Sequence, residues 1–134
     1  MAFLNKNYTF SKQENFDGFL KAVGIPDDKI AKLQNFAPDQ KIVQDGDSYV
    51  IHTAGPEGPK QIKFQSGVEF DDVIGTDKTP IKTKYTVDGN TVIQNISSDK
   101  GSAVFKREFV GDDLIVTITS DKWDGVAKRY YKAA

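Results

Sequence analysis

From residue 38 onward, short segments rich in Val, Ile, Thr, Phe and Tyr alternate with turns marked by Gly, Pro, Asp and Asn. The clearest alternation is Ile-Lys-Thr-Lys-Tyr-Thr-Val at 81–87, where both lysines hold even positions. Successive side chains of a strand point to opposite faces, so one face of this segment meets water and the other an interior. Nine such segments, together with residues 5–10, predict ten antiparallel strands.

The segment between residues 10 and 38 follows a helical period instead. Residues 11–14, Ser-Lys-Gln-Glu, match a capping box, and Gly24 and Pro26 supply stop signals. Residues 27–36 predict a second helix that begins at two aspartates and ends before Pro38. The apolar face of the first helix has the spacing i, i+3, i+4, i+7: Phe16, Phe19, Leu20 and Val23.

A long meander must curl or close to hide its edges, and the helix pair must then cover one open end. We therefore predict an all-β fold, a ten-stranded antiparallel up-and-down β-barrel (β-clam) with a helix-turn-helix lid, as a single domain over 1–134. Side chains just fill barrels of eight strands, so a wider barrel of ten is expected to enclose a cavity.

Composition narrows the function classes. Eighteen Lys and Arg against nineteen Asp and Glu give no basic excess for nucleic acid. No cysteine is present, and His52 is the single histidine, which disfavours thiolate or histidine metal sites and most nucleophilic catalysis. No apolar run approaches the roughly 20 residues of a membrane helix, and the first residues lack the order of a signal peptide. We expect a cytoplasmic, monomeric, non-enzymatic protein without a cofactor or metal.

Two arginines fall on inward positions of predicted strands. Arg107 shares its face with phenylalanines, and Arg129 shares its face with Tyr131. A guanidinium in an apolar interior is costly unless an anion pairs with it, and no acidic residue is obviously inward. The arginines either bind a ligand carboxylate with help from the tyrosine hydroxyl, or pair with inward carboxylates, or point outward at a bulge. The ligand tail would then lie among Phe16, Leu20, Val116 and Ile118.

Several sequence motifs of the chain resemble those of a known family. Residues 14–24, Glu-Asn-Phe-Asp-Gly-Phe-Leu-Lys-Ala-Val-Gly, are similar to the first-helix signature of the intracellular lipid-binding proteins, the fatty-acid-binding protein family. The pattern is closer to the insect midgut branch than to the vertebrate heart type. Further matches follow in order along the chain: Asp-Gly-Asp at 45–47, Gly-Val-Glu-Phe-Asp at 67–71, Val-Asp-Gly at 87–89, Arg-Glu at 107–108 and Arg-x-Tyr at 129–131.

The resemblance implies a carrier that holds a long-chain fatty acid inside the barrel and hands it on. It places the carboxylate clamp on Arg107, Arg129 and Tyr131. The chain departs from the family pattern at Asn5, where Gly is usual, and at Glu57, near an aromatic gate, and its last hairpin is longer. The resemblance assigns the lid, portal and inner wall to Phe16, Phe19, Leu20, Val23, Pro38, Gln40, Ile51, Thr53, Ile62, Val116 and Ile118.

Two alternatives stay open at this stage. Within the same class, the ligand would be a retinoid or a sterol-type lipid. In a different class, the protein would dock a membrane or a transporter through its lid, by transient contact, and the helices carry three lysines suited to that: Lys21, Lys29 and Lys32.

Overall fold

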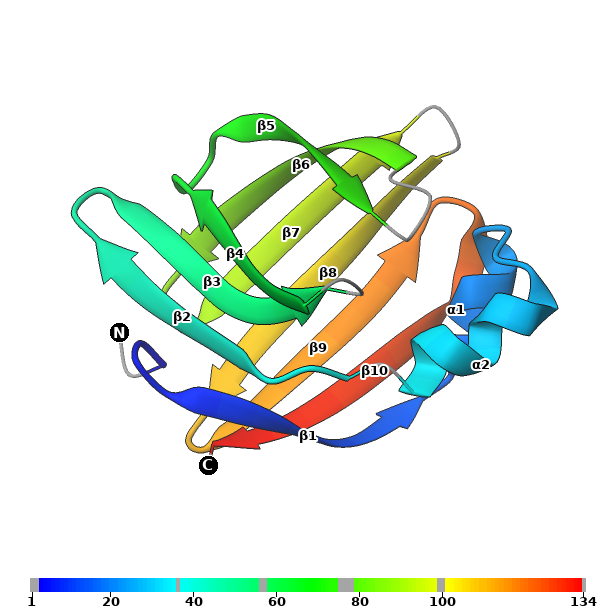
Figure 1. Ribbon diagram of the computed structural model, residues 1–134, viewed down its shortest axis with the longest axis horizontal. Coiled ribbons are helices and arrows are strands. Elements are labelled where there is room, and N and C mark those ends of the chain that lie inside the picture. The colour runs from blue at the N-terminus through cyan, green and yellow to red at the C-terminus, as the bar shows by residue number, and fades with distance from the viewer. Residues whose placement is uncertain (1–2, 36, 56–57, 75–78, 99–100, 134) are drawn as a thin grey trace.

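Ten antiparallel strands and two short helices make up the computed structural model of the protein (Figure 1). The structure describes residues 3–35, 37–55, 58–74, 79–98 and 101–133. The elements are β1 (Asn7–Glu14), α1 (Phe16–Ala22), α2 (Asp27–Asn35), β2 (Gln40–Asp45), β3 (Ser48–Gly55), β4 (Gly58–Phe64), β5 (Glu69–Ile74), β6 (Thr79–Asp88), β7 (Thr91–Ser98), β8 (Gly101–Val110), β9 (Asp113–Ser120) and β10 (Trp123–Ala133).

The strands form one sheet in the order β4-β3-β2-β1-β10-β9-β8-β7-β6-β5. Strands that follow each other in the chain pair with each other, except β4 and β5. In addition β1 pairs with β10, which links the two ends of the sequence. The sheet curls round on itself, and α1 and α2 lie together at one end of it (Figure 1). The predicted ten-stranded barrel with a helical lid is therefore confirmed. Among the described residues, no helix combines the length and apolar character needed to cross a membrane.

The barrel has one seam, between β4 and β5. These two strands are the ends of the sheet, and no backbone ladder joins them in the described part of the chain. Side chains bridge the seam instead: Nζ of Lys60 lies 3.9 Å from Oδ1 of Asp72. The ring of Phe64 stacks on that of Tyr85 with centroids 4.4 Å apart. Among the described residues, the Lys60–Asp72 ion pair and the Phe64–Tyr85 stack thus bridge the seam.

The start of the first helix differs from the prediction. A capping box at 11–14 is wrong, because β1 continues through Glu14 and Gln13 pairs with Arg129 of β10. Cross-strand pairing in the sheet outweighs the local capping preference of these residues. The helix begins instead after Asn15, which takes a left-handed conformation with φ 57° and makes no side-chain cap hydrogen bond.

Two of the departures noted in the sequence have structural counterparts. Asn5 has φ 65°, a left-handed conformation that Asn tolerates better than most residues other than Gly. The longer last hairpin is absorbed by a shift in register between Trp123 and Ala127, beyond which β10 pairs regularly with β9. Glu57 and Phe36, expected at the portal and in the second helix, lie outside the described residues.

Trp123 attaches α1 to the barrel. Its half-buried indole packs against α1, with its centroid 6.1 Å from that of Phe19. Gly18 and Gly125 leave the room that the indole occupies. A β-carbon at Gly18 would lie 3.3 Å from Cζ2 of Trp123, and one at Gly125 would overlap the indole.

Gly125→Ala is expected to lower the free energy of unfolding by about 1 to 3 kcal/mol, because the added methyl group overlaps an indole already held against α1. Gly18→Ala is the matched control on the same ring. It meets the indole less closely and gains about 1 kcal/mol of helix propensity, so the two effects offset. Denaturant unfolding of both variants measures the difference, and equal losses would contradict this packing.

Candidate functional site

The two inward arginines lie in one row across three strands. Arg107 on β8 and Arg129 on β10 are both paired with Val116 of β9, which lies between them. Paired residues of an antiparallel sheet share a face, and Val116 is 3% exposed, so the row faces the interior. Since neighbouring strands are about 4.8 Å apart, the α-carbons of the two arginines are about 10 Å apart, close enough for their long side chains to reach one group.

Arg107 is held by neutral amides. Its Nε donates to Oε1 of Gln40 at 3.2 Å, and its Nη1 donates to Oε1 of Gln94 at 3.0 Å. Because arginine only donates, both carboxamides must turn their oxygens toward it and their NH2 groups away. The NH2 group of Gln94 accordingly donates to Oγ1 of Thr83 at 3.3 Å. The network crosses the interior, since Gln40 lies on β2 and Arg107 on β8.

These amides orient Arg107 without neutralising it. Within the described ranges, no carboxylate lies at ion-pair distance from its guanidinium. The guanidinium also lies 5.9 Å from the centroid of the Tyr85 ring, whose pKa burial raises, so that phenol supplies no negative charge near neutral pH. Arg107 therefore presents a half-buried positive charge to the interior, and it can take an anion.

Arg129 is accommodated differently, by aromatic rings. Its guanidinium carbon lies 4.5 Å from the centroid of the Phe16 ring and 5.1 Å from that of Phe10. Attraction between a cation and a ring face is worth about 0.5 to 2 kcal/mol, more when water is excluded, and this side chain is only 9% exposed. Burial lowers the pKa of Arg129, and nearby Tyr131 opposes part of that shift.

Tyr131 lies on the same face of β10, two residues beyond Arg129. It is buried, and its ring meets Phe10 edge to face with centroids 5.7 Å apart. Phe10 thus contacts both the arginine and the tyrosine. The structure therefore brings the three residues of the expected clamp to one inner wall, formed by β8 and β10.

The sequence did not predict that the carboxylate of Asp72 lies on the inner face of the sheet. Asp72 pairs with buried Ile81, so it faces the interior, contrary to the expectation that nothing acidic does. It forms an ion pair with Lys60, across the seam. The sequence left open that inward carboxylates pair with the arginines; for Arg107, the described residues do not provide such a pair.

The remaining expected residues divide by exposure. Phe16, Phe19, Leu20, Ile51, Val116 and Ile118 are buried in the core. Val23, Pro38, Gln40, Thr53 and Ile62 are half-buried. The expected site did not include Phe10 and Tyr85, whose rings lie near the arginines, or Thr83 and Gln94, which extend the hydrogen-bond network of Arg107. Alternation could have found the last two, because Thr83 stands between Ile81 and Tyr85, and Gln94 stands two positions after Val92.

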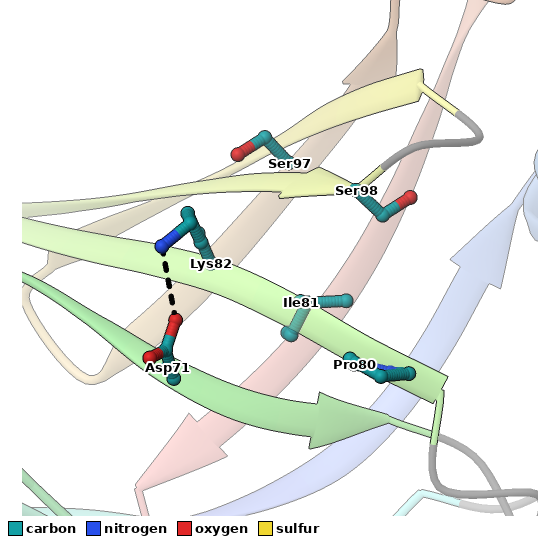
Figure 2. Close-up of a pocket in the computed structure, with 6 residues that line it drawn as sticks. All are labelled: Asp71, Pro80, Ile81, Lys82, Ser97 and Ser98. Carbon is teal, nitrogen blue, oxygen red and sulfur yellow. Dashed lines mark hydrogen bonds and ion pairs between the residues drawn. The ribbon is translucent and has the colours of Figure 1, made fainter.

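A pocket of about 470 Å³ lies elsewhere, where β5, β6 and β7 adjoin (Figure 2). Figure 2 shows Asp71 and Lys82 facing each other across its wall, joined by an ion pair of 3.2 Å. Both side chains are exposed on the outer surface. None of the expected site residues lines this pocket, and its charges already satisfy each other, so we do not place the functional site there.

Comparisons with known proteins point the same way as the sequence. Residues 1–131 match the model of the lipocalin / cytosolic fatty-acid binding protein family. Fatty acid-binding protein 2 of Manduca sexta is 56% identical over 99% of this chain and 100% of its own length.

Solved structures agree with this. The crystal structure of a fatty-acid-binding protein isolated from Manduca sexta has a TM-score of 0.92 and 56% identity, and the match covers 98% of this chain and 99% of that one. A Schistosoma mansoni fatty acid binding protein in complex with arachidonic acid has a TM-score of 0.88 and 25% identity, with coverage of 99% and 96%.

Arg107→Leu is expected to lower the free energy of unfolding by about 1 to 3 kcal/mol, because it strands the oxygen of buried Gln94 without a donor. Adding Gln94→Leu removes that oxygen too and should recover much of the loss. Denaturant unfolding of the ligand-free protein measures both. If the double variant is as unstable as the sum of the single ones, the two side chains do not act as a pair.

Proposed function

Because the chain belongs to the lipocalin / cytosolic fatty-acid binding protein family, we propose that it is a cytoplasmic carrier that binds a long-chain fatty acid inside its barrel. The carboxylate of the ligand meets a clamp formed by Arg107, Arg129 and Tyr131. The protein acts by equilibrium sequestration, without a chemical step: it raises the amount of fatty acid in solution and releases it where the unbound concentration is low.

The observation that carries this proposal is the row of two inward arginines on β8 and β10. Arg107 keeps its positive charge among neutral amides, and Arg129 lies among aromatic rings. Such an interior favours an anion over a neutral ligand, and Tyr131 adds a hydroxyl donor on the same wall. The apolar core residues around this row suit an alkyl chain and not a second polar group.

Two kinds of interaction then contribute to affinity. Each buried CH2 of the tail contributes about 0.8 kcal/mol, which is independent of the head group. Hydrogen bonds to a charged group contribute about 1.5 to 3 kcal/mol, which depends on the clamp. A retinoid or sterol-type lipid shares the first contribution, but only a ligand with an anionic head gains the second.

Membrane contact through the lid stays a prediction. Lys21, Lys29 and Lys32 are exposed, as such contact requires. Exposed aspartates lie on the same two helices, however, and balance their charge: Asp17, Asp27 and Asp28. Salt dependence of ligand transfer to anionic vesicles would reveal docking, because added salt screens such an attraction.

Arg129→Leu is expected to weaken palmitate binding by roughly 10- to 150-fold, because it removes charge-assisted hydrogen bonds to the head group. Hexadecanol, which has the same tail and no charge, should bind the variant and the natural protein with similar affinity. Tyr131→Phe should cost palmitate less than Arg129→Leu does. Calorimetric or fluorescence titration with both ligands measures these effects.

The control for this prediction is Lys132→Leu, which removes a positive charge from the exposed face of the same strand. It should leave both affinities unchanged. If Arg129→Leu lowers the affinity for palmitate and hexadecanol equally, or for neither, the guanidinium does not recognise the head group and the proposed clamp is wrong.

Palmitate affinity should also depend on pH in a direction that the clamp fixes. Opposite charges nearby lower the pKa of the bound carboxyl below its value in water, about 4 to 5. Affinity should therefore be constant above that value and fall as pH drops below it, while hexadecanol shows a flat profile over the range in which the protein stays folded. Parallel profiles for the two ligands would argue against the clamp.

A further inference from the structure

Phe16 is the first residue of α1, yet its ring contacts a charge on the barrel wall. The guanidinium carbon of Arg129 lies over this ring, 4.5 Å from its centroid. Phe10 of β1 contacts the same guanidinium at 5.1 Å. One of the two rings therefore belongs to the sheet and the other to the lid.

The position of Phe16 is itself fixed by neighbours. Its ring stacks on Phe19 with centroids 6.0 Å apart and an interplanar angle of 18°. Phe19 in turn packs against Phe105 at 5.9 Å and Trp123 at 6.1 Å. The contact with Arg129 is thus the end of an aromatic chain that runs through α1.

A ring face differs from a carboxylate in how it holds an arginine. It attracts the cation through the charge distribution of the π-system, without neutralising it. The two aromatic contacts therefore restrict where the guanidinium lies without removing its charge.

We propose that Phe16 is a positioning residue of the head-group site, which holds Arg129 where the ligand carboxylate meets it. The inference rests on the proposed function and adds a role for the lid helix in head-group recognition. Phe16 thus contributes to head-group recognition as well as to the apolar face of the lid. Because coupling between sites is reciprocal, a carboxylate bound at Arg129 also stabilises α1 in its position against the barrel wall.

The test compares two buried apolar residues of the same helix with two ligands. Phe16→Leu keeps an apolar side chain but removes the ring, so palmitate affinity should fall about 3- to 10-fold more than hexadecanol affinity. Leu20→Ala is the matched control, since Leu20 is a buried apolar residue of the same helix and carries no aromatic ring. It should change the two affinities by similar factors.

A conservative variant keeps the test decisive if Phe16→Leu does not fold. Phe16→Tyr retains the ring and should preserve the preference for palmitate, whereas Phe16→Met, flexible and apolar, should lose part of it. If Phe16→Leu or Phe16→Met weakens both ligands equally, Phe16 serves only as apolar cover and the inference is overturned. If the natural protein itself shows no preference for palmitate over hexadecanol, the proposed clamp fails, and this inference fails with it.

Discussion

Two guanidinium groups enclosed by an apolar barrel are the constraint on which this structure depends. Moving such a charge out of water is costly unless the surroundings supply compensation, and the chain supplies it in two ways. Arg107 receives amide oxygens from β2 and β7, while Arg129 receives ring faces from β1 and α1. In both cases the contacting residues come from elements far apart in the sequence. The contacts around both arginines can therefore form only after the sheet has curled.

The register of the sheet determines where Arg129 lies relative to the lid helix. β1 pairs with β10 from Tyr8 to Glu14, which extends the first strand to Glu14 and sets the start of α1 directly beside the inner wall. The same pairing places Gln13 opposite Arg129 and Phe10 opposite Tyr131. The helix that covers the barrel and the wall that carries the charge are therefore positioned by one ladder, and their geometry is shared.

Alternation along the strands was enough to place Arg107, Arg129 and Tyr131 on inner faces, because a period of two is a local property. The same rule applied to β7 would have found Gln94. The contact of Gln40 with Arg107 could not be found in this way, since it joins strands that the sequence separates by 67 positions. The capping box failed for a related reason, because the strand pairing that overrides it is made with the other end of the chain.

The seam between β4 and β5 has a mechanical consequence. Elsewhere, widening the barrel would break rows of backbone hydrogen bonds, but here the girth can increase by separating one ion pair and sliding stacked rings. Those contacts are weaker and less directional than a ladder. Compliance is therefore concentrated along a single line of the wall. In the proposed carrier, this line lets the barrel enclose tails of different bulk while the opposite wall, with its two arginines, keeps its shape.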